Sequence, residues 1–373
     1  MSQNPVIVGA GPVGLAAALF LAKRGITSRI IEKRLERSHE SRALAVNPRT
    51  LDLLQHTGVS ERMIELGRKL QGVSFYRHSE RIGTVSLNGL HPRYPFLLAL
   101  SQSTTERLLE DALTAAGGRV ERGVEMTLCQ PNSHGVDIEL SIKDRAEQTS
   151  CPWLLAADGA HSTARKCLDI GFPGSAFDND WHLADLPLET SLDAQHGHGF
   201  FLAEGGLSLL LPVVNGDEKP GSPQIWRVFS NHPDPLQHLV NARPAGEPVW
   251  SSKFRISHRL VDRFSQGGVY LAGDAAHIHS PIGARGMNLG IEDAWVFAEL
   301  AAKGGLDRYH ELRRPVDAAV VRRIERLTRF VSSESAAVRF VRQWVMPVAL
   351  GIPAVTHRMR RIATGLDHPI PTP

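Results

Sequence analysis

The feature that most constrains the fold is a run of glycines close to the N-terminus. An apolar strand at residues 6–8 leads into the sequence GAGPVG, and a helical run and a second apolar strand ending at Glu32 follow. In such a unit Gly9 permits the tight turn, Gly11 lets a pyrophosphate approach the backbone, and Gly14 lets helix and strand pack closely. Glu32 can then bind ribose hydroxyls. The spacing predicts an α/β fold with a Rossmann-like dinucleotide-binding unit.

A second stretch, residues 268–302, has the pattern of a short strand, a carboxylate, a loop and a long helix. Asp274 follows the strand, where a carboxylate can accept hydrogen bonds from sugar hydroxyls beside the free N–H groups of a helix N-terminus. Gly283 and Gly286 would let the backbone approach a planar ring, and the two residues after Gly286 would offer first-turn N–H groups to it. An ordinary strand-to-helix turn capped by Asp274 is the alternative.

A third stretch, residues 153–162, is also a strand that ends in Asp-Gly. Asp158 and Gly159 close the strand, and Ser162 is placed to cap a short helix that contains Arg165. By itself this pattern is typical of a turn.

Together and in this order, the three motifs resemble those of the class A flavoprotein monooxygenases, the para-hydroxybenzoate hydroxylase-like and phenol hydroxylase-like family. The resemblance extends over most of residues 1–300. It implies a Rossmann-like FAD-binding domain with an inserted antiparallel β-sheet substrate domain and a C-terminal helical region. It also implies non-covalent FAD, NAD(P)H as a transient reductant, and transfer of oxygen from O2 to a small aromatic substrate through a C4a-hydroperoxyflavin.

The resemblance further implies the site residues. Arg42 and Gln102 match positions that contact the dinucleotide, although a solvated loop arginine and a polar strand-end residue are the alternatives. Val124 matches a position whose backbone meets adenine. Pro281 and Gly283 would wall the oxygen pocket, with no classical acid or base. The predicted cofactor-binding residues are Gly9, Gly11, Gly14, Glu32, Lys33, Arg42, Gln102, Val124, Asp158, Asp274, Gly286, Met287 and Asn288.

The predicted domains are discontinuous. Short alternating apolar runs broken by Gly and Pro indicate antiparallel strands, whereas the end of the chain has a helical pattern. The predicted divisions are 1–71, 101–171 and 266–305 for the FAD-binding domain, 72–100 and 172–265 for the substrate sheet, and 306–373 for the helical region.

Composition limits the other classes of function. Three cysteines without paired spacing support neither a disulfide frame nor a zinc site, and we expect no metal ligands around His277 and His279. The serines lack a nucleophile-elbow context, so hydrolase chemistry is not supported. We expect a cytoplasmic protein, because no signal peptide precedes the first strand and no apolar run reaches the length of a membrane span.

The last part of the chain is basic. From residue 306 onward twelve arginines stand against six acidic residues. Aromatic residues are not interleaved with them, so we expect a solvated helix face and no nucleic-acid partner. The apolar run 344–355 is compatible with a membrane, a second subunit or packing within the chain, and we favour the last. The oligomeric state stays open.

The substrate is the least constrained feature. The substrate sheet is apolar and aromatic without a cluster of Lys or Arg, which favours a phenolic or polycyclic aromatic over an anionic benzoate. Arg227 would reverse this preference if it pointed into the cavity. Arg285, which with Ala284 replaces the family's usual Gly-Gln pair, would either point to solvent or add positive charge near the phosphates. A flavin-dependent reductase or oxidase without oxygen insertion is the alternative function.

Overall fold

The first layer of the molecule is a six-stranded sheet in the order β19-β20-β12-β1-β2-β8. Its strands are β1 (Val6–Val8), β2 (Arg29–Glu32), β8 (Val120–Arg122), β12 (Leu154–Ala156), β19 (Ser265–Gln266) and β20 (Val269–Leu271). All except β19 run parallel. The central strands are wholly apolar and buried, as expected of a parallel sheet covered on both faces. The computed structural model describes residues 4–37, 43–77, 80–143, 145–202, 206–216, 218, 221–236, 239 and 242–371.

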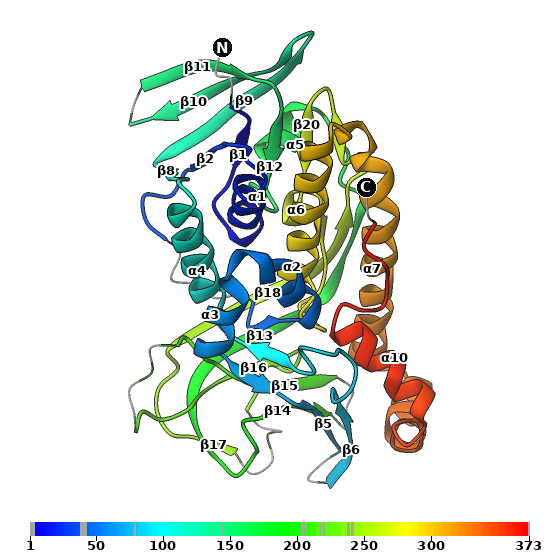
Figure 1. The fold of residues 1–373 in the computed structure, drawn as a ribbon. Helices are drawn as coiled ribbons and strands as arrows, with labels where there is room; N and C mark the ends of the chain where they lie inside the picture. Colours follow the sequence, from blue (N-terminus) through cyan, green and yellow to red (C-terminus); the bar gives the residue numbers. More distant parts are fainter. Residues whose placement is uncertain are drawn as a thin grey trace.

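Helix α1 (Pro12–Ala22) lies between α4 (Gln102–Ala115) and α6 (Gly286–Lys303) in Figure 1. Its central position explains its composition, since residues 14–21 are all buried and none is charged. The shorter helical elements nearby are α2 (Pro48–Leu54), η1 (Gln55–Thr57), α3 (Val59–Leu66), α5 (Thr163–Cys167) and η2 (Gly273–Ala275).

Two small antiparallel sheets complete this part of the molecule. The meander β9 (Val124–Asn132), β10 (Gly135–Ile142) and β11 (Arg145–Cys151) shares an apolar cluster with the parallel sheet through Met126, Val136 and Leu140. The second sheet has the order β3-β7-β4 and consists of β3 (Ala45–Val46), β4 (Arg68–Leu70) and β7 (Leu97–Ala99).

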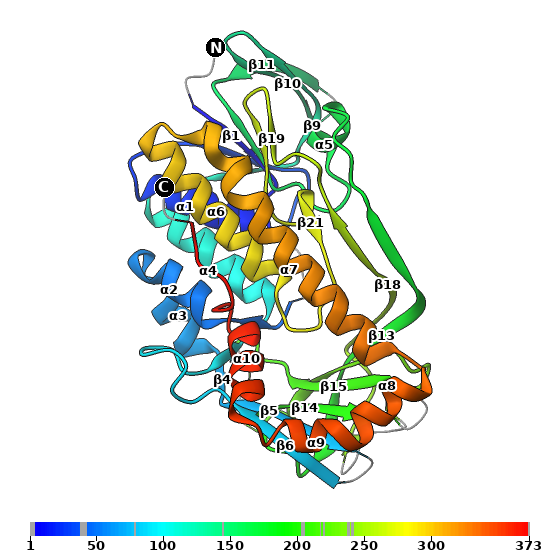
Figure 2. The ribbon, with the colours of Figure 1, turned by 90° about the vertical axis from the view of Figure 1, so that its right-hand side faces the viewer.

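The substrate sheet has the main order β21-β18-β13-β16-β15-β14-β5-β6, with β17 paired to β13. Its strands are β5 (Gly72–Arg77), β6 (Glu80–Ser86), β13 (Gly174–Thr190), β14 (His196–Phe201), β15 (Leu207–Pro212), β16 (Ile225–Ser230), β17 (Ala242–Pro244), β18 (Trp250–Leu260) and β21 (His277–Ile278). The long strands β13 and β18 run from this sheet towards the parallel sheet (Figure 2). The domain division remains our proposal, and strand pairing differs from it at β7 and at β21.

The C-terminal region is helical. It comprises η3 (Leu306–Arg308), α7 (Tyr309–Ser332), α8 (Ala336–Phe340), the π-helical η4 (Val341–Val345), α9 (Met346–Ala349) and α10 (Pro353–Ala363). Helix α7 packs beside α6 and reaches the substrate sheet, and α8 to α10 lie at the edge of that sheet (Figure 2). Among the described helices, none has the length and apolar character that crossing a bilayer requires.

Candidate flavin-binding site

Three strand ends meet at one edge of the parallel sheet. The register pairs Val8 with both Ile31 and Ala156, and Ala156 with Leu271. Because parallel strands place their carboxyl ends at the same edge, the turns after these strands converge there. Three motifs that lie far apart in the sequence therefore form one site.

The glycine loop has space where a pyrophosphate is expected. A Cβ on Gly9, which has φ +99°, would collide with the carbonyl of Ala157, and one on Gly14 would collide with the carbonyl of Gly9. A Cβ on Gly11 would meet no described atom within 4 Å, and Gly11 has the ordinary φ of −73°. Gly11 is therefore needed for space and not for backbone conformation, and it lies at the N-terminus of α1, where free N–H groups favour an anion.

The two kinds of glycine predict different mutant phenotypes. Gly14→Ala should lower the free energy of unfolding by about 2 kcal/mol, because the helix must move away from the strand. Gly11→Ala should change that free energy by less than about 0.5 kcal/mol but weaken FAD binding, because its methyl group enters the open space. Urea unfolding of the apoprotein and FAD titration measure the two effects; equal stability losses would contradict the assignment.

Glu32 is held at the glycine loop by main-chain donors. Its Oε2 accepts the N–H of Ala10 at 2.8 Å, and its Oε1 accepts the N–H of Arg34 at 3.0 Å. Lys33 between them is exposed. The first residue of β9, Val124, is beside this turn, because the N–H of Gly123 donates to the carbonyl of Arg34 at 3.3 Å. The arrangement brings all three predicted positions to one corner, and their contacts with the cofactor stay predictions.

Gln102 is fixed by contacts within the chain. Its Oε1 accepts the N–H of Ala43 at 3.2 Å, and its Nε2 donates to Glu106 at 2.8 Å. Burial raises the pKa of Glu106 to about 6. Arg42 lies outside the described residues.

Asp158 closes the second turn. Its Oδ2 accepts the N–H of Thr163 at 2.7 Å, and burial raises the pKa of the carboxyl. Its Oδ1 has no hydrogen-bond partner in the described part of the chain. Arg165 joins two of the turns because it donates to the carbonyls of Ala160 at 2.8 Å and Ala275 at 3.0 Å.

The third turn presents Asp274 outward. Asp274 is exposed, whereas Gly273 and Ala275 on either side are buried. The turn is held from within by Asp293 of α6, whose Oδ2 accepts the N–H of Gly273 at 2.9 Å and contacts Nε2 of His277 at 2.8 Å. Asp293 is not among the residues predicted from the sequence, where its signal is an acid within the apolar run of α6.

A buried charge cluster supports this turn. Asp293, Arg313, Asp317 and His277 all have fully buried side chains, and Arg313 donates to Asp293 at 2.7 Å and to Asp317 at 2.5 Å. His277, Asp293 and Asp317 each offer one ligand atom, and these atoms lie close enough together to hold a metal ion. This grouping was not predicted from the sequence. Since the Arg313 guanidinium already supplies the positive charge, we interpret the cluster as a structural ion network.

The loop before α6 reaches the same edge. Pro281 is exposed, and a turn joins its carbonyl to the N–H of Ala284 at 2.9 Å. Gly283 has φ +89° and Ala284 has φ +53°, so the loop is sharply bent. A Cβ on Gly286 would approach only His279 among the described residues, at 3.9 Å. The loop thus leaves space at the N-terminus of α6.

The side chains of Met287 and Asn288 face inward and are buried. Asn288 accepts the N–H of Asn47 at 3.0 Å and donates to the carbonyls of Ala45 at 2.9 Å and Ala284 at 2.7 Å. The predicted contribution of these two residues to a ligand is therefore limited to their main chain.

Arg285 contradicts both sequence-based alternatives. It is fully buried, and it donates to the carbonyl of Ile362 at 2.8 Å and to the carboxylate of Asp367 at 2.9 Å. It points neither to solvent nor to the phosphate end of the site, because it is bound by the C-terminal segment, where it shares the Asp367 carboxylate with Arg323. His368 of the same segment contacts Glu292 of α6 at 2.6 Å.

Arg227 lies on the face of the substrate sheet opposite Trp226 and Val228, as the alternation predicts. It is buried, with two hydrogen bonds of 2.7 Å to Asp185, and its guanidinium lies 5.4 Å from the ring centre of Trp250. The Asp185 carboxylate of the same sheet neutralises the charge of Arg227.

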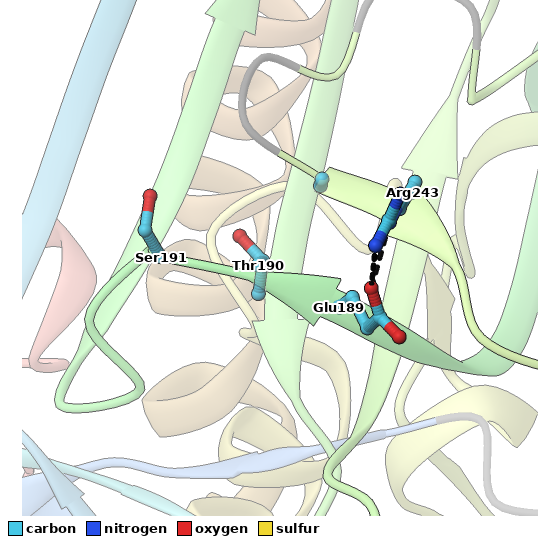
Figure 3. Close-up of a pocket in the computed structure, with 5 residues that line it drawn as sticks. Glu189, Thr190, Ser191 and Arg243 are labelled. Atoms are coloured by element: carbon cyan, nitrogen blue, oxygen red, sulfur yellow. Dashed lines mark hydrogen bonds and ion pairs between the residues drawn. The ribbon is translucent and has the colours of Figure 1, made fainter.

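A separate hollow lies on the substrate sheet. Glu189, Thr190 and Ser191 line it from the end of β13 and the following turn, together with Ala242 and Arg243 of β17 (Figure 3). Arg243 donates to Glu189 at 2.7 Å. This hollow is at the opposite end of β13 from β21 and does not belong to the flavin site.

The site fits a dinucleotide with a polyol chain. The features that fit it are the open space at Gly11, the exposed Asp274 and the Oδ1 atom of Asp158, which has no partner among the described residues. A family described as FAD binding domain matches residues 4–324. The chain belongs to the class A FAD-dependent aromatic monooxygenase family. As a member of this family, it binds FAD.

Two sequence relatives and one solved structure illustrate the similarity. The 6-methylpretetramide 4-monooxygenase of Streptomyces rimosus is 33% identical over 93% of this chain and 64% of its own length. The pentachlorophenol 4-monooxygenase of Sphingobium chlorophenolicum is 30% identical over 83% of this chain and 62% of its own length. The crystal structure of the p-nitrophenol 4-monooxygenase PnpA from Pseudomonas putida DLL-E4 has a TM-score of 0.85, covers 98% of both chains and is 21% identical, so it shows the fold alone. The chain spans less than two thirds of the length of either sequence relative.

Proposed function

We propose that this chain is an FAD-dependent monooxygenase that uses NAD(P)H and O2 to hydroxylate a phenolic or polycyclic aromatic compound. One observation carries the proposal: a site that fits FAD faces an aromatic-rich sheet. Ile282, next to the predicted pocket wall, packs in one apolar cluster with Phe201, Phe229 and Trp181 of that sheet. The names of the sequence relatives support the reaction class, since they describe monooxygenases of a pretetramide and a chlorinated phenol.

Each part of the chain has a positional role in this proposal. The N-terminus of α1 and Glu32 hold the dinucleotide end, and Asp274 accepts hydrogen bonds from the polyol chain. The N-terminus of α6 favours negative charge next to the bent loop, through its unpaired N–H groups. Pro281 and Gly283 form the wall that separates the reacting atoms from water. Bound FAD supplies the redox chemistry and the activation of O2.

The substrate preference rests on Arg227. A carboxylate substrate would need a buried cation, but the guanidinium that the sequence singled out is already bound to Asp185. We therefore propose a neutral or phenolic ring as the substrate. The three cysteines are free thiols, and on this basis we propose a reducing, cytoplasmic setting.

Arg227 gives a stability prediction. Arg227→Met should lower the free energy of unfolding by about 2 kcal/mol, because Asp185 is left buried without its partner. Arg227→Met with Asp185→Leu should recover most of the loss. Both variants should still hydroxylate a neutral phenol. A selective loss of benzoate hydroxylation in the stable double variant would show that Arg227 binds substrate.

Asp274 gives a cofactor prediction. Asp274→Ala should weaken FAD binding by about 1–3 kcal/mol through loss of a hydrogen-bonding carboxylate. Fluorescence titration of the apoprotein with FAD measures the effect, and acid precipitation should release all flavin from the wild type. Asp111→Ala, which removes an exposed carboxylate on α4, is the control. Equal affinity in both variants would mean that Asp274 does not touch the cofactor.

The function is tested by measuring NAD(P)H consumed, hydroxylated product formed and H2O2 released in one reaction. Phenols, hydroxybenzoates and polycyclic phenols are the substrates to compare. Product formation that matches consumption supports the proposal. Release of H2O2 without hydroxylated product would support an oxidase. Flavin reduction that yields neither product nor H2O2 would support a reductase. Failure of both NADH and NADPH to reduce the flavin would reject the proposal.

A further inference from the structure

The helical segment after α7 exposes a line of large apolar side chains. Phe340, Trp344, Val348 and Ile352 are 59%, 56%, 69% and 47% exposed. With the neighbouring exposed Val341 and Val345, they follow the segment through α8, η4 and α9 to the residue before α10. We call them the C-terminal ridge. The segment lies at the outer edge of the substrate sheet, at the opposite end of the molecule from β9–β11 (Figure 2).

The ridge is exposed although its segment is firmly held. Arg342 is buried and donates to the carbonyls of Phe330 at 3.3 Å and Ser333 at 2.5 Å, next to the end of α7. Arg77 of β5 donates to the carbonyl of Gln343 at 2.9 Å and lies 5.2 Å from the ring centre of Trp344. These contacts hold the segment in place, and the Arg77 guanidinium partly covers Trp344 of the ridge. The packing within the chain that the sequence analysis favoured therefore applies to the inner side only.

Positive charge accompanies the ridge. Residues 334–361 contain five arginines and one acid, Glu334, although Arg342 is buried and Arg339 and Arg360 are half-buried. Arg358 and Arg361 of α10, the helix that follows the ridge, are exposed. Exposed Trp and aliphatic side chains combined with arginines are typical of helices that lie in the interface of a membrane.

The charge decides between the possible occupants of this surface. In a symmetric dimer the same surface would meet its own copy, and its excess of arginines would face like charges. An anionic lipid surface complements both the apolar side chains and the arginines. We propose that the C-terminal ridge, with Arg358 and Arg361, docks on an anionic membrane surface without crossing it. This inference does not depend on the proposed reaction.

The test is co-sedimentation of the FAD-loaded protein with vesicles. We expect binding to phosphatidylcholine vesicles with about 30 mol% phosphatidylglycerol, weak binding to pure phosphatidylcholine, and weaker binding as salt is raised, because salt screens the arginines. Val348→Ser should lower the partition coefficient about ten-fold by removing apolar contact. Arg358→Gln should lower it about five-fold, the equivalent of about 1 kcal/mol per basic residue.

Matched controls isolate the surface. Val249 is 71% exposed, much as Val348 is, but lies in the bend just before β18, so Val249→Ser should leave vesicle binding unchanged. Arg263→Gln removes an exposed arginine between β18 and β19 and serves as the control for Arg358→Gln. Flavin content and urea unfolding should be the same in all four variants, because every changed side chain is exposed.

Three other outcomes would each overturn the proposal. No binding to anionic vesicles rejects a membrane surface. Binding that depends on Arg358 but not on Val348 means general attraction of a basic protein to anions. A dimer by light scattering that Val348→Ser dissociates, without vesicle binding, assigns the ridge to a second copy of the chain.

Discussion

Replacing Arg313 with Met should lower the free energy of unfolding by about 4 kcal/mol, because the ionised Asp293 carboxylate stays buried without its guanidinium partner and Asp317 loses a hydrogen-bond donor. Arg313 donates to Asp293 at 2.7 Å and to Asp317 at 2.5 Å, and all three side chains are fully buried. Met has nearly the helix propensity of Arg and similar length, so the change isolates the charge. Urea unfolding of the apoprotein measures the loss.

The control is on the same helix. Arg326 of α7 is exposed, and Arg326→Met should change the free energy of unfolding by less than about 0.5 kcal/mol. Arg313→Met should also weaken FAD binding, because Asp293 accepts the N–H of Gly273 and thereby positions the turn that carries Asp274. A loss below about 1 kcal/mol would indicate that water replaces the guanidinium.

The stability of the protein should fall as pH rises from about 6.5 to 9, and His277 should account for about 3 kcal/mol of the fall. Burial opposes protonation of this ring, but the Asp293 carboxylate outweighs it and raises the pKa of His277 to about 9. A group whose pKa is raised on folding contributes its full stabilisation below its ordinary pKa. That contribution is lost as pH rises through the folded pKa.

The pKa shifts of the groups around His277 agree with a fall in stability as pH rises. Burial also raises the pKa of Asp317, so the ionisation of this group likewise lowers the stability of the folded protein as pH rises. Arg313 stays charged, and the pKa of Tyr309 is raised by burial, so neither titrates in this range. For Asp293, burial opposes ionisation, but Arg313 and His277 lower the pKa to about 2. His279 has its pKa lowered to about 3 by burial and stays neutral.

Urea midpoints at several pH values test the prediction. His277→Asn should flatten the dependence between pH 6.5 and 9, whereas His357→Asn, at an exposed position on α10, should retain it. An unchanged slope in His277→Asn would show that the ring is neutral in the folded protein at neutral pH.

The sequence by itself determined the family, the FAD cofactor and the local form of the turns. The turn formed by the GAGPVG run and the Ser162 cap of α5 both appear as predicted, with Ser162 accepting the N–H of Arg165 at 3.0 Å. These features depend on residues within a few positions of each other, so their geometry is written into adjacent residue types.

Only the tertiary structure decided which charged groups pair. Arg285 meets Asp367, Arg227 meets Asp185 and Arg313 meets Asp293, at separations of 82, 42 and 20 residues. No periodicity links such partners, because the fold brings them together and burial then makes each pairing obligatory. The same reason applies to the C-terminal ridge. Most of it lies in the apolar run 344–355 that the sequence shows, but which of its side chains are covered depends on the position of α7 and β5.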